Sequence, residues 1–160
     1  MPFSYFLPYK KRTTKGDGIH NSLEVAKLIN YIMTDGKKSV AERIVYDVFA
    51  KIKSENNDPL KILHLAISNI APEHEVKPRR LGGASYLVPI EVRKERRIYL
   101  ALNWLIEKAS LKSNKEFKTF SAKLYKELMD ASNNIGDAVN KKIETEKLAE
   151  ANKAFAHYRW

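Results

Sequence analysis

The sequence contains no cysteine, and this absence removes several classes of chemistry at once. Without thiols the chain has no disulfide bonds, no thiolate ligands for zinc and no cysteine nucleophile, a composition that suits a reducing compartment. The four histidines are His20, His64, His74 and His157, and their spacing is not that of metal ligands. We therefore expect no metal site and no cofactor.

Long apolar runs are also missing. No stretch approaches the roughly 18 apolar residues that a membrane-spanning helix requires. The opening segment, residues 1–8, is apolar but short, and it is broken by proline and lacks the basic lead of a signal peptide. The sequence thus predicts no membrane partner.

Motifs for catalysis are absent as well. The pair Gly36-Lys37 suggests a phosphate-binding loop, but the first glycine of such a loop would fall at Tyr31. Neighbouring carboxylates such as Glu144 and Glu146 belong to a polar segment, where solvation is their ordinary role. We predict that the protein is not an enzyme and has no small-molecule substrate.

What the sequence does have is positive charge, and this charge is clustered. Lys and Arg number 29 against 19 acidic residues, which gives a net charge of +10. Residues 1–16 carry four basic side chains and no acidic one, and residues 76–98 carry seven basic side chains against two acidic ones. Clustering favours a nucleic-acid partner over charge that serves only solubility.

Apolar residues recur at helical spacing in about six segments. We expect the fourth helix from about residue 98, the fifth from about 117, and the sixth from 137 to the C-terminus, while Gly36 and Pro72 end the first and third. The second helix is expected to bury a stripe that includes Val40. The predicted N-terminal caps of the first three helices are Asn21 with Glu24, Ser39 with Glu42, and Asp58 followed by Pro59.

Between residues 75 and 92 the pattern changes to alternation, with Gly82-Gly83 near its middle. This arrangement predicts a β-hairpin that turns at the glycines. Pro78 and Pro89 cannot donate ladder hydrogen bonds, so we expect a ribbon with exposed edges. Because a two-stranded ribbon is marginal in water, we also expect a bound partner to order it.

The sequence therefore predicts a mainly α fold, in which a bundle of about six helices carries one protruding two-stranded β-hairpin. Residues 1–18 are expected to form an extended basic arm. Residues 19–160 are expected to form a single helical domain that includes the hairpin.

The cationic hairpin is the sharpest functional feature. A thin ribbon that bears Lys77, Arg79 and Arg80 can lie along folded RNA, with guanidinium groups on phosphate oxygens. At the C-terminus, Phe155 and Trp160 have two alternatives of equal weight, stacking on unpaired bases or packing against the helices.

Three blocks of sequence carry a resemblance to a known family. They read IMTDGKKS and AERIVY at 32–46, RRLGGASY and VPIEVR at 79–93, and AEANKAFAHYRW at 149–160. In these blocks the chain resembles small ribosomal subunit protein seven of the bacterial type, and the resemblance runs from about residue 17 to residue 160.

This resemblance implies a structural constituent of the ribosome with six helices and a β-ribbon. It implies a primary binder of the 3′ major domain of small-subunit rRNA that nucleates head assembly near the decoding region. Exit-site tRNA, mRNA and small-subunit proteins nine and eleven would be its neighbours. The location would be the small subunit in the bacterial cytoplasm, or in an organelle. Some members repress their own messenger RNA, which the sequence leaves open here.

Carried over by position, the implied contacts fall into two sets. The tRNA-proximal residues of the hairpin would be Arg80, Gly82, Gly83 and Tyr86. The rRNA-binding residues would be Lys10, Lys11, Arg12, Lys37, Lys38, Lys77, Arg79, Arg80, Arg93, Arg96, Arg97, Lys141, Lys142 and Arg159.

The chain departs from the family pattern in several places. Residues 3–9 are apolar where the family has an Arg-rich run, and residues 110–117 are less basic than expected. Asn140, Ile143 and Glu146 replace residues that are commonly basic or His. These departures reduce the implied contacts of the first nine residues and of the last helix.

A helical DNA-binding regulator is the alternative from another class. Gly36 between two helices suggests a helix-turn-helix, and the positive charge suits DNA as well as RNA. However, no predicted helix carries a dense row of Arg, Asn or Gln for reading bases. Footprinting on duplex DNA would separate the two hypotheses.

Overall fold

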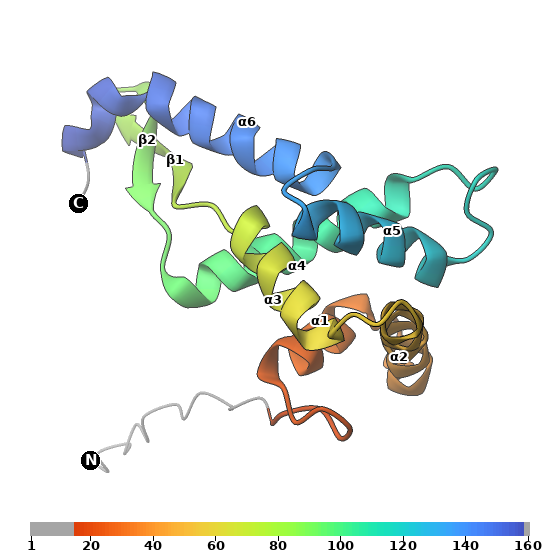
Figure 1. Cartoon of the computed structure of the whole chain (residues 1–160). Helices are drawn as coiled ribbons and strands as arrows, with labels where there is room; N and C mark the ends of the chain where they lie inside the picture. Colours follow the sequence, from red (N-terminus) through yellow and green to blue (C-terminus); the bar gives the residue numbers. More distant parts are fainter. Residues whose placement is uncertain (1–14, 159–160) are drawn as a thin grey trace, which may run out of the picture.

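The computed structural model describes residues 15–158. Within that range the prediction of a mainly helical fold with one two-stranded hairpin is confirmed (Figure 1). The predicted boundary at residue 18 between an arm and a domain stays a prediction. The elements in chain order are α1 (Leu23–Ile32), α2 (Lys38–Ser54), α3 (Pro59–Ile70), β1 (His74–Leu81), β2 (Ala84–Glu91), α4 (Lys94–Leu111), α5 (Phe120–Ser132), α6 (Asp137–Ala151) and the 3₁₀ helix η1 (Lys153–Tyr158).

The predicted cap of the first helix is wrong by one residue. Ser22 is the N-cap of α1, and its Oγ accepts a hydrogen bond from the Val25 N–H at 3.5 Å. Asn21 has a φ of 49°, so it lacks the extended backbone that a capping residue needs. The carboxylate of Asp17 accepts N–H groups from the turn that contains Asn21, and this turn fixes where the helix begins.

The predicted capping box of the second helix is also wrong. Lys37 occupies the N-cap position of α2 without a side-chain hydrogen bond, and Ser39 already lies in the first turn. The reason is the preceding turn, in which Asp35 and Gly36 both have positive φ and bring the chain round early. Val40 is 48% exposed, so it does not belong to the buried stripe of α2.

The third helix is confirmed as predicted. Asp58 Oδ1 accepts the Leu60 N–H at 3.0 Å, and Pro59 occupies the first turn, where a missing N–H costs nothing. The helix ends at Ile70, just before Pro72.

The later helices exist, but their bounds differ from those predicted. Helix α4 begins at Lys94, four residues before the first apolar position. Helix α5 begins at Phe120 because Thr119 Oγ1 caps it by accepting the Ala122 N–H at 3.3 Å. Helix α6 ends at Ala151, and the chain then tightens into η1 instead of continuing as one helix.

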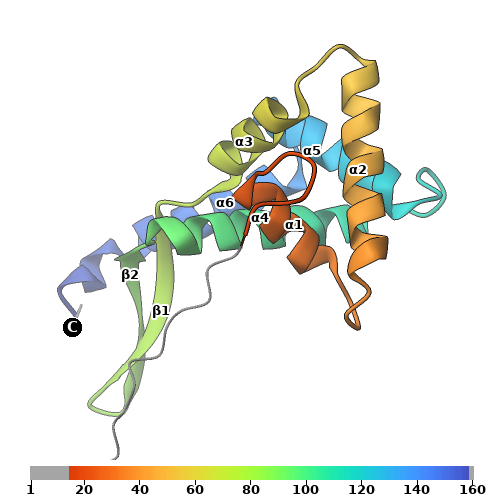
Figure 2. The same ribbon diagram turned by 90° about the horizontal axis from the view of Figure 1, so that it is seen from below.

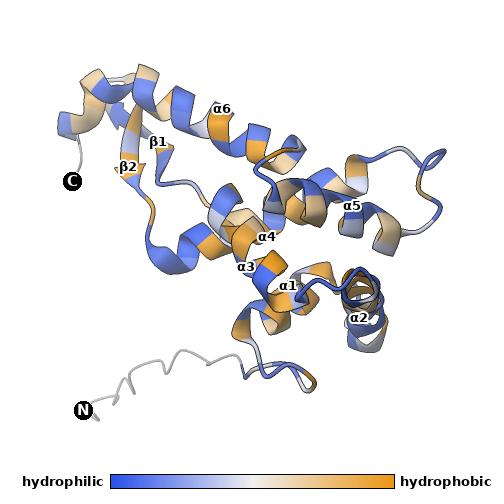
Figure 3. Ribbon diagram, in the orientation of Figure 1, coloured by the Kyte–Doolittle hydropathy of each residue, from blue (hydrophilic) through white to orange (hydrophobic). Residues whose placement is uncertain are grey.

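The core lies where the apolar faces of the helices meet. Asn69 of α3 ties this interior to the end of α5 by donating to the carbonyl oxygens of Ala131 and Ser132, at 2.9 and 3.1 Å. In Figure 3 the first turn of α4 and much of α6 are hydrophilic, whereas α1 and α3 are largely apolar. The largest fully buried apolar side chains are those of Val25, Leu28, Ile29, Val45, Ile52, Leu63, Ile70, Leu102, Leu105, Leu124 and Leu128.

The two strands form a ribbon that projects from the helical body (Figure 2). They are antiparallel, and their pairing runs from His74 opposite Glu91 to Leu81 opposite Ala84. Gly82 and Gly83 form the two-residue turn with φ values of 55° and 90°. Positive φ at both central residues is the requirement of a type I′ hairpin turn, so the predicted turn is confirmed.

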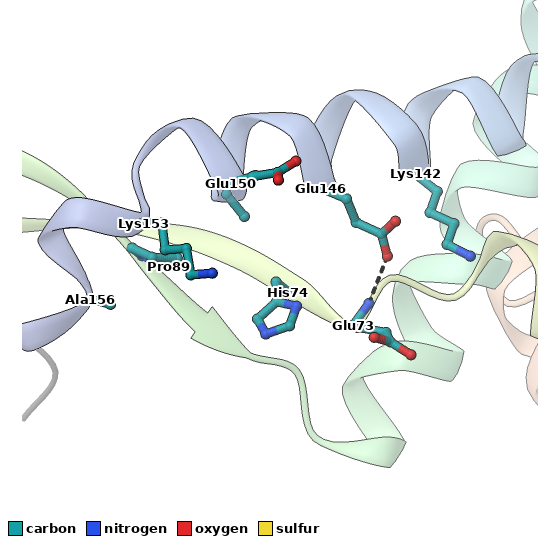
Figure 4. Close-up of a pocket in the computed structure, with 9 residues that line it drawn as sticks. Glu73, His74, Pro89, Lys142, Glu146, Glu150, Lys153 and Ala156 are labelled. Atoms are coloured by element: carbon teal, nitrogen blue, oxygen red, sulfur yellow. Dashed lines mark hydrogen bonds between the residues drawn. The ribbon is translucent and has the colours of Figure 1, made fainter.

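The base of the ribbon is packed against the helical body, and the expectation that a bound partner orders the ribbon stays a prediction. Val88 is fully buried, and the backbone of the base is closed by a hydrogen bond from Val92 N to the Glu73 carbonyl at 2.9 Å. The Glu73 N–H donates to Glu146 Oε1 of α6 at 3.1 Å (Figure 4). Burial against α6 and η1 supplies the support that an isolated ribbon would lack.

Candidate nucleic-acid interface

The end of the ribbon carries two exposed arginines. Arg79 lies opposite Tyr86, and Arg80 lies opposite Ser85, both close to the glycine turn. Within the described part of the chain, Arg80 forms no ion pair. Both residues are therefore exposed near the end of the ribbon.

The base of the ribbon is less positive than the sequence suggests. Glu75 accepts Arg96 Nη2 at 3.2 Å, and Lys77 Nζ lies 3.8 Å from its other oxygen. The Arg96 guanidinium also stacks over the Tyr99 ring at 5.4 Å from its centroid. Arg96 is thus oriented by its own chain, and its side chain keeps 48% exposure for a partner.

A second cationic group surrounds the start of α4. Arg93 is the N-cap residue and is exposed, Lys94 is exposed, and Arg97 is half-buried. The N-terminus of a helix is the positive end of its dipole, where cations are disfavoured by about 0.3–1 kcal/mol each. Only Glu95 in the first turn has the favourable sign. These cations therefore do not stabilise α4 in the free protein. Their position favours a role in binding an anion.

The start of α2 repeats this arrangement. Lys37 and Lys38 are exposed, no acidic residue lies in the first turn, and no side chain caps the helix. Lys38 Nζ lies 3.8 Å from Glu42 Oε1, a weak surface pair. Figure 2 shows that the turn before α2 and the ribbon project toward the same side of the helical body.

The cations predicted on the last helix have acidic neighbours. Lys141 Nζ lies 3.6 Å from Glu144 Oε2. Lys142 lines a cavity of about 460 Å³ between α6 and the ribbon (Figure 4). Glu146, one of the family departures, accepts the hydrogen bond from Glu73 and so has a structural role.

The C-terminal aromatics pack against the ribbon. The Phe155 ring lies 5.2 Å from the Tyr86 ring, and Tyr158 lies 5.7 Å from it. For Phe155 this geometry favours packing over base stacking. Five residues with predicted roles lie outside the described residues, namely Lys10, Lys11, Arg12, Arg159 and Trp160.

Sequence reasoning missed a buried ion pair that positions α6. Glu127 of α5 is fully buried, and its Oε1 accepts the Ala138 N–H at 2.9 Å in the first turn of α6. Lys112 Nζ lies 2.7 Å from Glu127 Oε2. Among the described residues, this oxygen has no other hydrogen-bond partner. Burial lowers the pKa of Lys112, but the hydrogen bond and charge of Glu127 outweigh it and raise the pKa. Nothing local distinguishes Glu127 from a solvated helical glutamate.

No cluster of three or more potential metal ligands occurs among residues 15–158. Among the same residues, no helix combines the length and apolar character that crossing a membrane requires.

Comparison with known proteins decides among the functional classes. Residues 7–153 match the protein family described as "Ribosomal protein S7p/S5e". The chain belongs to this ribosomal protein family. The resemblance read from the three sequence blocks is confirmed, and so is the prediction of a ribosomal protein that is not an enzyme. The alternative of a helical DNA-binding regulator is not supported.

Members of the S7p/S5e family from bacteria are similar over nearly the whole chain. The small ribosomal subunit protein uS7 of Caldicellulosiruptor bescii is 51% identical over 96% of this chain and 97% of its own length. The proteins of the same name from Mycoplasma mycoides and Acetivibrio thermocellus are each 52% identical, over 94% of this chain and 96% and 95% of their own lengths.

Proposed function

We propose that this chain is a structural component of the bacterial small ribosomal subunit and that it binds small-subunit rRNA through the ribbon and the cationic starts of α2 and α4. The observation that carries the proposal is the exposure of Arg79 and Arg80 at the end of a ribbon that the helical body holds in place. The relatives named small ribosomal subunit protein uS7, each about half identical, support the assignment to that subunit.

The physical argument concerns where positive charge is displayed. A guanidinium fork matches two phosphate oxygens, and its affinity grows when the group is held in place before binding. The helix starts add N–H groups and a favourable dipole for an anion. Phosphate contacts near Lys37 and Arg93 would relieve the repulsion that these cations experience in the free protein.

The finer location follows from the family resemblance. We propose that the RNA is the 3′ major domain and that binding nucleates assembly of the head near the decoding region. The ribbon tip would approach exit-site tRNA and mRNA, with small-subunit proteins nine and eleven as neighbours. Open space around the backbone of Gly82 and Gly83 is consistent with close approach at the tip.

Competition binding tests this function. The full chain should bind a 3′ major-domain RNA fragment tightly in the presence of excess unrelated RNA. Replacing Arg79 and Arg80 together with Ala should weaken binding by about 10-fold or more, since each phosphate contact contributes separately. The double change to Lys should recover part of the affinity, because charge returns without the planar fork.

The matched control removes the same charge elsewhere. Lys53 at the end of α2 and Lys118 before α5 are both exposed. The end of α2 and the start of α5 lie far from the ribbon in Figure 2. Replacing both with Ala should leave affinity nearly unchanged. Equal loss in the two double variants, or displacement by unrelated RNA as readily as by target, would contradict the proposal.

A further inference from the structure

The ribbon is attached to the helical body at two places along its length. The first is its base, where Glu73 hydrogen-bonds to Glu146 of α6. The second lies much nearer the turn and involves the C-terminal segment. Tyr86 stands three residues after Gly83 and contacts rings that belong to η1. The cationic end of the ribbon is therefore supported close to Arg79, which pairs with Tyr86 across the strands.

The second attachment is an aromatic cluster that joins Tyr86 to the rings of Phe155 and Tyr158. Phe155 lies 5.2 Å from Tyr86, Tyr158 lies 5.7 Å from Tyr86, and Phe155 and Tyr158 stack at 6.4 Å with an interplanar angle of 14°. All three residues are half-buried. Ring pairs at such separations attract beyond the area that they bury. Tyr86 is thus engaged by its own chain, although the sequence places it among residues close to tRNA.

The segment that supplies these rings is itself fixed. Helix η1 follows α6 directly. Asn152 donates its Nδ2 group to the Leu148 carbonyl of α6 at 2.7 Å, and its own carbonyl accepts the Phe155 N–H of η1 at 2.9 Å. Lys153 and Ala156 border the cavity between α6 and the ribbon (Figure 4). The rings on η1 therefore have a defined place relative to the helical core.

We propose that Phe155 and Tyr158 are positioning residues that clamp Tyr86 and hold the cationic end of the ribbon in one orientation before RNA binds. The consequence for affinity rests on the proposed function. A ribbon that is already oriented loses less conformational freedom on binding, so the clamp strengthens RNA binding without touching RNA.

Amide hydrogen exchange on the free full-length protein tests the clamp without RNA. Phe155→Ala should accelerate exchange in residues 84–88 roughly tenfold, because it removes two ring contacts. Exchange in α3 and α5 should not change. Phe155→Tyr keeps the ring and should restore slow exchange. Phe117→Ala removes an equally half-buried ring in the loop before α5 and is the matched control.

Unchanged exchange in residues 84–88 of Phe155→Ala overturns the proposal. So does acceleration that is equal in the ribbon and in α3, because that result means general destabilisation. Tyr86→Phe, which keeps the ring, should behave like the unaltered protein.

Binding to the 3′ major-domain fragment gives the second readout. Phe155→Ala should weaken affinity several-fold at every salt concentration, with an unchanged salt slope because no cation is lost. Unchanged affinity would overturn the positioning role. The double Arg79/Arg80 variant tests RNA contact separately. If that variant binds normally, the proposed function fails, while the exchange result still decides whether the clamp exists.

Discussion

At the scale of single residues, the most consequential side chain is a buried carboxylate. Glu127 links three segments, because it caps α6 through Ala138 and pairs with Lys112 at the end of α4. Gly136 leaves the room that this contact needs, since a Cβ there would lie 3.2 Å from Glu127 Oε1. The ribbon rests on α6, so Glu127 positions the interface from a distance.

Glu127→Ala should destabilise the protein strongly. The change leaves the Lys112 ammonium without its nearest counter-charge, and breaking a buried pair costs about 3–5 kcal/mol. Glu127→Gln, which can still accept the Ala138 N–H, should cost less. Urea unfolding measures both effects. Glu144→Ala, at an exposed position of α6, should change the free energy of unfolding by less than about 0.5 kcal/mol, and an equal loss there would contradict the assignment.

Asp17 predicts a pH dependence. Burial raises the pKa of this carboxyl, but the backbone N–H groups of His20, Ser22 and Ile19 outweigh burial, and the pKa is lowered from its ordinary value of 3.8. A lowered pKa in the folded state means that the stabilisation is fully present above 3.8. It is lost as the pH falls through the folded pKa.

The Asp17→Asn protein should therefore be less stable than the unaltered protein at pH 7, and this difference should shrink as the pH falls below the ordinary carboxyl value of 3.8. Urea unfolding at a series of pH values measures it. The exposed residue Asp47 offers a control through Asp47→Asn. A difference that grows on acidification would refute the role of Asp17.

At the scale of elements, the ribbon turn sets a backbone requirement. Gly82 and Gly83 both have positive φ, where a residue with a Cβ is disfavoured by roughly 1–2 kcal/mol. Gly83→Val should accelerate amide exchange near the turn, and Gly83→Asn should do so less because Asn tolerates this conformation. Gly18→Ala is the control, because Gly18 does not have a positive φ and an added Cβ there meets no atom within 4 Å. Equal exchange in the Val and Asn variants would argue against a strained turn.

The elements themselves were largely predictable, and their ends were not. Periodicity located the helices because burial of one face is a local pattern in sequence. The caps at Ser22 and Lys37 depended on turns fixed by Asp17 and Gly36, which periodicity does not encode. Periodicity also did not predict that η1 packs against Tyr86, a residue far away in the sequence.

The candidate site also has a part that the sequence predicts and a part that it does not. Sequence alone located the cations of the ribbon because clustering is visible along one stretch of chain. It could not foresee that Glu75, just before that stretch, would neutralise part of the charge of Arg96. It also could not assign Phe155 to the ribbon, because residues 86 and 155 meet only in the folded chain.

At the scale of the whole molecule, exposed cations gather on the ribbon and at the starts of α2 and α4. This distribution predicts that RNA binding is sensitive to salt. A surface that neutralises 6–10 phosphates should lose about 10³–10⁵ in RNA affinity between about 50 and 200 mM salt. Replacing Arg79 and Arg80 with Ala should reduce the slope of log affinity against log salt by about two. Filter binding across salt concentrations measures the slope, and an unchanged slope would show that these arginines do not contact phosphates.

The register of the ribbon has a consequence for the free protein. The pair that closes a two-residue hairpin turn is hydrogen-bonded, and bonded and non-bonded pairs alternate from there. Counting from Leu81 and Ala84, both Pro78 and Pro89 fall at non-bonded pairs, so their missing N–H groups would have faced outward. Each outer edge thus lacks a donor that a third strand would need. Pro78 is exposed, so its missing donor should hinder edge-to-edge aggregation of a copy made before its RNA is available. Light scattering of a Pro78→Thr variant should then reveal self-association that the unaltered chain resists.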